Sequence, residues 1–273
     1  MMKNIPFPAL GDWAETRQTL HAYAKVLGTI RGAFSPEQAH YWQLSLLPYT
    51  AGLTTSPIPH PADKRRNFSL SMDLRNHYIL LTNSEGGVKQ MRMAEGLSAT
   101  QLGERLLGKL AEMGVEGEVN RQKYEDESPR SYALDDAERY FTALTHVARL
   151  FEKMKAELKG ESSPVQLWPH HFDLSLVRFG TKTVKTEEGD YPSQVGFGFS
   201  PPDDSQPQDY FYVNPFPYED KVSAAPLTPA AAWYTASWKG ALLPYAAVAD
   251  KEDGAQILES FLRAAWEAEK GFI

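Results

Sequence analysis

Residues 30–38 have the sequence IRGAFSPEQ, and residues 158–166 have the sequence LKGESSPVQ. The second stretch begins 158 − 30 = 128 positions after the first, and four of the nine positions are identical: Gly, Ser, Pro and the final Gln. Each stretch closes an amphipathic segment with a basic residue and Gly, which is typical of a helix end. Each then continues through Ser-Pro into an expected strand. The pair therefore predicts a duplicated unit, repeated at an offset of about 128.

Four segments have the apolar spacing of amphipathic helices. The expected helices cover residues 12–32, 98–114, 135–160 and 253–265. Each begins at an Asp or Ser whose side chain can accept a hydrogen bond from a backbone amide, followed three residues later by Glu or Gln. These pairs are Asp12 and Glu15, Ser98 and Gln101, Asp135 and Glu138, and Asp253 and Gln256. The first three helices are expected to end at Gly32, Gly114 and Gly160.

Between these helices, apolar residues alternate with polar ones, which is the period of a half-buried strand. The expected strands are residues 42–46, 68–72, 78–81, 88–93, 172–179, 195–199 and 210–213. Segments 115–134 and 181–192 are polar and are expected to be exposed connections.

Together these patterns predict an α+β fold with two similar halves, each made of antiparallel strands packed with flanking helices. We expect the first half in residues 1–120 and the second in residues 121–273, forming one compact unit. A pocket is expected at the junction of the halves.

Composition excludes several classes of protein. The chain has 273 residues and a formal net charge of −7, which argues against nucleic acid as the main partner. It contains no cysteine, so disulfides, thiolate metal sites and cysteine nucleophiles are excluded. Residues 1–8 show no signal peptide, and no segment has the roughly 18 apolar residues that a membrane span needs. We therefore expect a cytoplasmic protein without a membrane or nucleic-acid partner.

Several short motifs occur in a familiar order. They are Leu53–Pro57, Ser163–Val165, Leu167–Leu174, Gly198–Pro201, Tyr210–Val213 and Trp238–Tyr245. With these motifs the chain resembles the bacterial domain-of-unknown-function family 5996 from about Trp13 to Trp266. The resemblance implies a cytosolic, single-chain protein and supplies no reaction. The chain departs from the family pattern at Ser193-Gln194, where His-Glu is frequent, and at Lys239, near which an acidic residue is frequent.

The densest group of chemically active residues is His170-His171-Phe172-Asp173. If these residues belong to a strand, His171 and Asp173 point to one face and Phe172 points to the core. A His/Asp pair at this spacing can supply two metal ligands, or a base and the group that orients it. In the alternative, Asp173 holds His171 by a simple hydrogen bond and the pair is structural.

Four further residues are candidates for ligand binding. His40 lies before the strand expected in the first half, where it faces the other histidines or bonds a loop carbonyl. Trp168 and Tyr212 belong to an aromatic set that suits a flat or sugar-like ligand, or packs on a sheet face. Arg178 is placed either to bind a ligand carboxylate or to pair with an acidic side chain on the next strand.

The sequence supports two hypotheses of function. The first is non-catalytic or regulatory binding of a small polar ligand in an aromatic-lined pocket between the halves, with no resident metal. The second is a metal-assisted hydrolase that uses His171, Asp173 and either His40 or His170. No glycine-rich phosphate loop or Gly-x-Ser-x-Gly nucleophile elbow occurs in the chain. The residues therefore leave open the cofactor, the oligomeric state and whether the protein is an enzyme.

Overall fold

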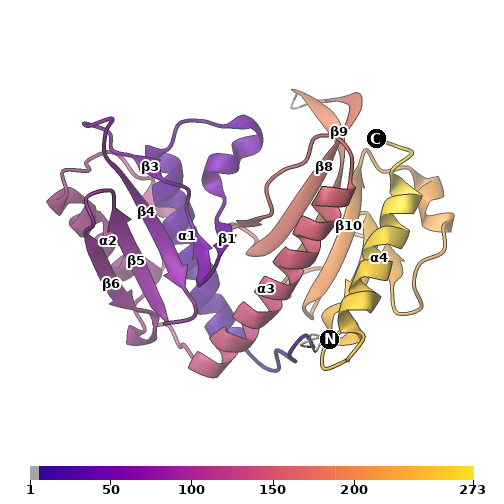
Figure 1. The fold of residues 1–273 in the computed structure, drawn as a ribbon, viewed down its shortest axis with the longest axis horizontal. Coiled ribbons are helices and arrows are strands. Elements are labelled where there is room, and N and C mark those ends of the chain that lie inside the picture. The colour runs from indigo at the N-terminus through magenta and orange to yellow at the C-terminus, as the bar shows by residue number, and fades with distance from the viewer. Residues whose placement is uncertain (1–5, 188) are drawn as a thin grey trace. The chain divides into compact units, whose positions relative to one another are not determined.

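The fold is α+β, as the sequence predicts (Figure 1). It comes from a computed structural model that describes residues 6–187 and 189–273; most of the segment searched for a signal peptide, residues 1–5, lies outside this range. Two antiparallel six-stranded sheets are present. The α-helices are α1 (Ala14–Phe34), α2 (Ala99–Glu112), α3 (Leu134–Glu157) and α4 (Gly254–Glu269). Short 3-10 helices are η1 (Ala39–Leu44), η2 (Met93–Glu95), η3 (Arg121–Lys123), η4 (Asp220–Ala224) and η5 (Tyr245–Ala247).

The chain forms two compact units. The N-terminal unit comprises Leu10–Phe141 and Leu167–Phe172, and the C-terminal unit comprises Met1–Ala9, Thr142–Gln166 and Asp173–Ile273. The division falls within α3, between Phe141 and Thr142, and the short return segment belongs to the N-terminal unit. Our division into domains at residue 120 stays a prediction.

The N-terminal unit contains the first sheet. Its strands are β1 (Leu47–Tyr49), β2 (Gly52–Thr54), β3 (Ile58–Pro59), β4 (Asn67–Asp73), β5 (Tyr78–Asn83) and β6 (Val88–Arg92). Their order is β1-β2-β4-β5-β6, with β3 paired to β4. Helix α1 packs against α2 and against β3 and β4, and its inner face is fully buried at Leu20, Leu27 and Ile30. Burial of this apolar face is the main stabilisation of the unit.

The second sheet lies in the C-terminal unit except for Leu167 and Trp168 of β7, which belong to the N-terminal unit. Its strands are β7 (Gln166–Trp168), β8 (Asp173–Thr186), β9 (Gly189–Ser200), β10 (Tyr210–Phe216), β11 (Ala232–Tyr234) and β12 (Gly240–Pro244). Their order is β11-β12-β10-β9-β8-β7. Helix α4 packs beside β9, β10 and β12 (Figure 1). The core contains Phe199, Phe211 and Tyr245, whose ring centroids lie 5.2–5.7 Å apart.

The observed helix starts confirm the capping signal predicted for α2 and contradict the one predicted for α1. Ser98 accepts a hydrogen bond from the Gln101 amide, and the Gln101 side chain accepts one from the Ser98 amide, so the capping box of α2 is confirmed. Helix α1 begins one residue later than expected, with Trp13 at its N-cap, and its expected cap Asp12 is wrong. The expected end at Gly32 is also wrong, because Gly32 lies inside α1.

One predicted strand and one predicted connection are wrong. Residues 42–46, expected as a strand, belong mostly to η1, in which His40 and Tyr41 adopt left-handed backbone angles with φ of 54° and 58°. The alternation does not determine the backbone by itself, since residues 68–72 alternate over the same length and do form part of a strand, β4. Segment 181–192, expected as a connection, extends the hairpin of β8 and β9 through the register Thr183↔Pro192 to Thr186↔Gly189. Cross-strand hydrogen bonds stabilise this ribbon without an apolar face.

Each half of the chain has the order helix, antiparallel strands, helix. The glycines that define the offset of 128 have different environments, since Gly32 is helical whereas Gly160 follows the end of α3 with φ of 101°. The internal repeat therefore stays a prediction. Among the described residues, none of the helices has both the length and the apolar character to cross a membrane.

Candidate functional site

Two segments lie antiparallel to each other on the C-terminal half of α1. Leu46 and Leu167 exchange both backbone hydrogen bonds, with N–O distances of 2.8 and 2.7 Å. A β-carbon at Gly28 would lie 2.6 Å from Cγ of Pro169, and one at Gly32 would lie 2.5 Å from Cδ2 of Leu44. The two glycines, one helical turn apart, therefore allow both segments to approach the helix closely.

The turn 169–172 has a defined conformation. Phe172 has φ of 60°, and its amide donates to the carbonyl of Trp168 over 2.8 Å. Its buried ring stacks between Tyr140 and His21, with centroids 5.4 and 5.6 Å away. Nε2 of His21 lies 3.2 Å from the carbonyl oxygen of His170. Because a carbonyl only accepts, Nε2 carries the proton.

His21 also contributes to the electrostatics near this turn. Burial, together with the charge of Lys25, lowers the pKa of His21 to about 4. The ring is therefore neutral at pH 7 and acts as a hydrogen-bond donor that fixes the turn. Partial burial and the neighbouring His171 likewise hold the pKa of His170 below its ordinary value.

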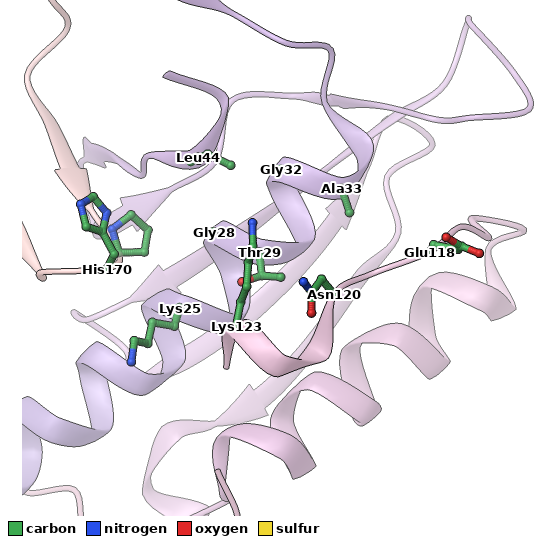
Figure 2. A pocket seen from close by; sticks show the side chains of 11 residues that line it. Lys25, Gly28, Thr29, Gly32, Ala33, Leu44, Glu118, Asn120, Lys123 and His170 are labelled. Atoms are coloured by element: carbon green, nitrogen blue, oxygen red, sulfur yellow. The ribbon is translucent and has the colours of Figure 1, made fainter. Parts of the chain in front are cut away.

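A cavity of about 490 Å³ opens beside this part of α1 (Figure 2). This volume is in the range of sites for small organic molecules. The lining comes from α1, from the end of η1, from the turn at 169–170 and from the segment that includes η3. The lining residues are Lys25, Gly28, Thr29, Gly32, Ala33, Leu44, Glu118, Asn120, Lys123, Pro169 and His170. All of them belong to the N-terminal unit.

The cavity carries two ammonium groups. Lys25 belongs to α1, and Lys123 extends from η3 toward α1 (Figure 2). Among the described residues, neither lysine makes a side-chain hydrogen bond or an ion pair, and the same is true of Glu118. The two lysines and Glu118 leave one net positive charge at the lining. The cavity therefore combines apolar lining residues with a net positive charge.

Four of the predicted site residues lie in or next to the wall of this cavity. His170 lines it. Ring centroids of Trp168 and His170 lie 5.8 Å apart, and those of His170 and His171 lie 4.3 Å apart. His40 belongs to η1, which ends at the lining residue Leu44, and its ring lies 5.4 Å from that of Trp42. The structure thus brings His170, His171 and Trp168 together, and it places His40 on the neighbouring segment of the wall.

The predicted pairing of His171 and Asp173 on one strand face is wrong. His171 lies in the turn 169–172, and β8 begins only at Asp173. The left-handed backbone of Phe172 interrupts the extended conformation on which the alternation of faces depends. Asp173 belongs to the C-terminal unit, where the hydroxyl of Tyr212 donates to its Oδ2 over 2.5 Å.

Tyr212 lies across the sheet from Gly198, its partner in the register of β10 and β9. The phenol ring occupies the space above Gly198 that a side chain would need, since a β-carbon there would lie 2.0 Å from the ring. Burial, the charge of Asp173 and its hydrogen bond raise the pKa of Tyr212 well above its ordinary value. At pH 7 the phenol is therefore a fixed hydrogen-bond donor to Asp173.

Arg178 is also a structural residue. Its Nε donates to the carbonyl of Lys159 over 2.7 Å, and one terminal nitrogen donates to the carbonyl of Glu161 over 3.1 Å. The guanidinium group covers Gly160. Arg178 thus fixes the loop after α3 and makes no ion pair with another described residue, and its role in ligand binding stays a prediction.

The sequence analysis missed the two lysines. Lys123 lies in a segment that was expected to be an exposed connection, and Lys25 lies between apolar positions of a helix. The available signal was the spacing of Gly28 and Gly32, which marks one face of α1 as a place of close approach. Within the described ranges, no three His, Asp or Glu side chains are grouped as metal ligands.

Comparisons with known proteins identify a family and leave its activity open. A search of curated proteins and a search of solved structures gave no match. Residues 6–271 match the family model described as "Family of unknown function (DUF5996)". This match spans nearly the whole chain, so the resemblance expected from the short motifs is confirmed. The chain belongs to the DUF5996 family.

Proposed function

We propose that the protein binds a small anionic molecule in the cavity beside α1. The observation that carries the proposal is the pair of lysines, Lys25 and Lys123, which line the cavity without an ion-pair partner among the described residues. The sequence analysis expects an aromatic-lined pocket between the halves, whereas the proposal places the ligand within the N-terminal unit. The binding is non-catalytic, and the expected cytoplasmic location remains part of the proposal.

Electrostatics support an anion as the ligand. The chain as a whole has a net charge of −7, whereas the two lysines and Glu118 give the lining of this cavity one net positive charge. An ion pair at an exposed site such as Lys123 contributes about 0.2–1 kcal/mol. Asn120 and Thr29, which also line the cavity, add polar groups for the same ligand.

The apolar lining indicates that the ligand also has an uncharged part. Ala33, Leu44 and Pro169 surround the glycine floor of the cavity. Burying apolar ligand surface there contributes about 25 cal/mol per Å². A small carboxylic acid or phosphate ester with a hydrocarbon part matches both features of the lining. The alternative, a metal-assisted hydrolase that uses His171 and Asp173, has no supporting observation at either residue.

The test is an NMR titration of the ¹⁵N-labelled protein with two probes, inorganic phosphate and acetate. We expect amide shifts at residues 25–33 and 118–123, and we expect affinity for both probes to fall at least tenfold in the double variant Lys25→Gln/Lys123→Gln. The matched control is Lys64→Gln/Lys155→Gln, which changes the net charge equally. Lys64 and Lys155 also have no ion pair among the described residues and do not line the cavity.

The two outcomes are clearly separated. Loss of binding in the cavity variant with retention in the control supports the proposal. Equal weakening in both double variants would mean that only the overall charge attracts the probes. That result, or an absence of shifts around the cavity in the unmodified protein, would overturn the proposal.

A further inference from the structure

The segment next to the cavity has an unusual backbone. His40 and Tyr41 are consecutive residues with left-handed angles, at φ of 54° and 58°. Such a conformation is unfavourable for residues with a β-carbon, and it persists only where the surroundings determine it. Here the side chain of the buried Gln43 accepts a hydrogen bond from the amide of Gln38 over 3.0 Å, and the Tyr41 amide donates to the Gln38 carbonyl over 3.2 Å.

This backbone presents aromatic rings to solvent. Tyr41 is 68% exposed, the largest exposed fraction among the exposed large apolar side chains of the described chain. Trp42 follows it and is half-buried, and Leu44, two residues further, lines the cavity. Exposing a tyrosine on an unfavourable backbone gives no folding stability, because the ring buries little surface. Backbone strain at an exposed position is typical of binding sites.

A second group of rings lies on the opposite segment of the same wall. The pairing of Leu46 with Leu167 aligns the end of η1 with the end of β7, which carries Trp168, and with the turn after it, which carries His170. Leu44 and Pro169 then contact neighbouring glycines of α1. Of the four rings on these two segments, that of His170 lines the cavity, whereas Tyr41 and Trp42 precede the lining residue Leu44 and Trp168 precedes the lining residue Pro169. Both segments contribute directly to the cavity.

We infer that the ligand of this site is a planar aromatic acid, whose anionic group lies at Lys25 and Lys123 and whose ring lies against His170, with Tyr41 and Trp42 at the rim. The inference rests on the proposed anion binding and adds the chemical class of the uncharged part. Aromatic pairs contribute beyond the burial of apolar area, because ring edges and faces carry complementary partial charges. An imidazole without charge, such as that of His170, stacks on such a ring without desolvating an ion.

The test compares benzoate with cyclohexanecarboxylate, which has the same anionic group and a similar size but a puckered, saturated ring. In the NMR titration, we expect benzoate to bind at least fivefold more tightly than cyclohexanecarboxylate. The variants Tyr41→Ala and His170→Ala are each expected to weaken benzoate about three- to tenfold. Acetate is titrated into the same variants, and we expect it to lose less affinity than benzoate does. The matched control is Tyr191→Ala, because Tyr191 is also an exposed tyrosine, 40% accessible, but lies in the C-terminal unit.

A further variant separates ligand binding from a structural role. Tyr41→Gly relieves the left-handed backbone, so we expect a higher melting temperature together with weaker benzoate binding. A purely structural tyrosine would give no loss of affinity. Equal affinity for benzoate and cyclohexanecarboxylate, or unchanged benzoate binding in both Tyr41 variants, would overturn the aromatic preference and leave the proposed function intact. Failure of acetate and phosphate to bind would overturn both.

Discussion

Arg31 and Glu269 are the most completely buried charged residues of the N-terminal and C-terminal units, and their surroundings differ in kind. The Arg31 guanidinium donates to the carbonyl and hydroxyl oxygens of Ser45 and to the hydroxyl of Ser56. Both carboxyl oxygens of Glu269 lack a hydrogen-bond partner among the described residues.

The two pKa values explain how both arrangements persist. Burial lowers the pKa of Arg31 only to about 10, so this side chain stays charged at pH 7 and requires acceptors. Burial raises the pKa of Glu269 to about 9, so this side chain is neutral at pH 7. A buried group that cannot lose its charge is bonded by the fold, whereas one that can lose it tolerates an apolar setting. The lysines of the cavity differ from both cases, because Lys25 is only partly buried and Lys123 is exposed.

The largest expected effect concerns Glu269. Its pKa is raised in the folded state, so its contribution to stability is fully present below pH 4.5, the ordinary pKa of a glutamate, and is lost as the pH rises toward 9. Each unit of pKa difference corresponds to about 1.4 kcal/mol. We expect Glu269→Gln to increase the free energy of unfolding at pH 8 by several kcal/mol relative to its effect at pH 4, measured by urea denaturation.

An exposed glutamate serves as the control for this prediction. Glu152→Gln on α3 should leave the pH dependence of unfolding unchanged, because Glu152 is exposed. A pH dependence that is the same in Glu269→Gln and in the unmodified protein would contradict the buried, neutral state of Glu269.

A smaller effect is expected at Arg31. Ser56→Ala removes the acceptor of one guanidinium nitrogen, which lies 3.0 Å from the Ser56 hydroxyl. Leaving a buried donor unsatisfied costs about 1–3 kcal/mol. Because Arg31 stays charged below its pKa of about 10, this loss should be the same at pH 5 and pH 8, in contrast to Glu269. Denaturation of the variant at both pH values checks this, and a loss found at only one of them would contradict it.

The smallest effect is expected at the buried Asp173, which accepts a strong hydrogen bond from Tyr212. In its bonding, Asp173 is intermediate between Arg31 and Glu269. Tyr212→Phe keeps the ring above Gly198 and removes only the hydroxyl, so we expect a loss of about 1–2 kcal/mol in the free energy of unfolding. Binding of acetate and phosphate should not change, because Tyr212 does not line the cavity of the N-terminal unit. Weakened anion binding in this variant would return Asp173 and Tyr212 to the list of ligand-binding candidates.

The predictions of helices and strands are correct where the local sequence determines the backbone conformation. The capping box of α2 involves only Ser98 and Gln101, which are three positions apart, and its prediction is confirmed. Strand β4 has seven residues of alternating character and was also found. The conformation of His40 and Tyr41 depends instead on the side chain of Gln43 and on packing against α1. The alternation of apolar and polar residues carries no information about either contact.

The candidate site shows the same limit. His170, His171, His40 and Trp168 were selected for their chemistry, and the structure places them in or beside one wall. The lysines were missed because Lys25 and Lys123 are 98 positions apart and ordinary in their local context. Only the approach of η3 to α1 gives them a common cavity.

The segments beside the cavity also carry natural fluorescent groups. Of six tryptophans in the chain, two, Trp42 and Trp168, are half-buried on the two segments that form this wall. Indole emission shifts in wavelength and intensity when water leaves its surroundings or when a second ring system approaches. We therefore expect a ligand in the cavity to change the intrinsic fluorescence, although neither indole lines the cavity itself, and exchange of either indole for phenylalanine assigns the signal to one segment.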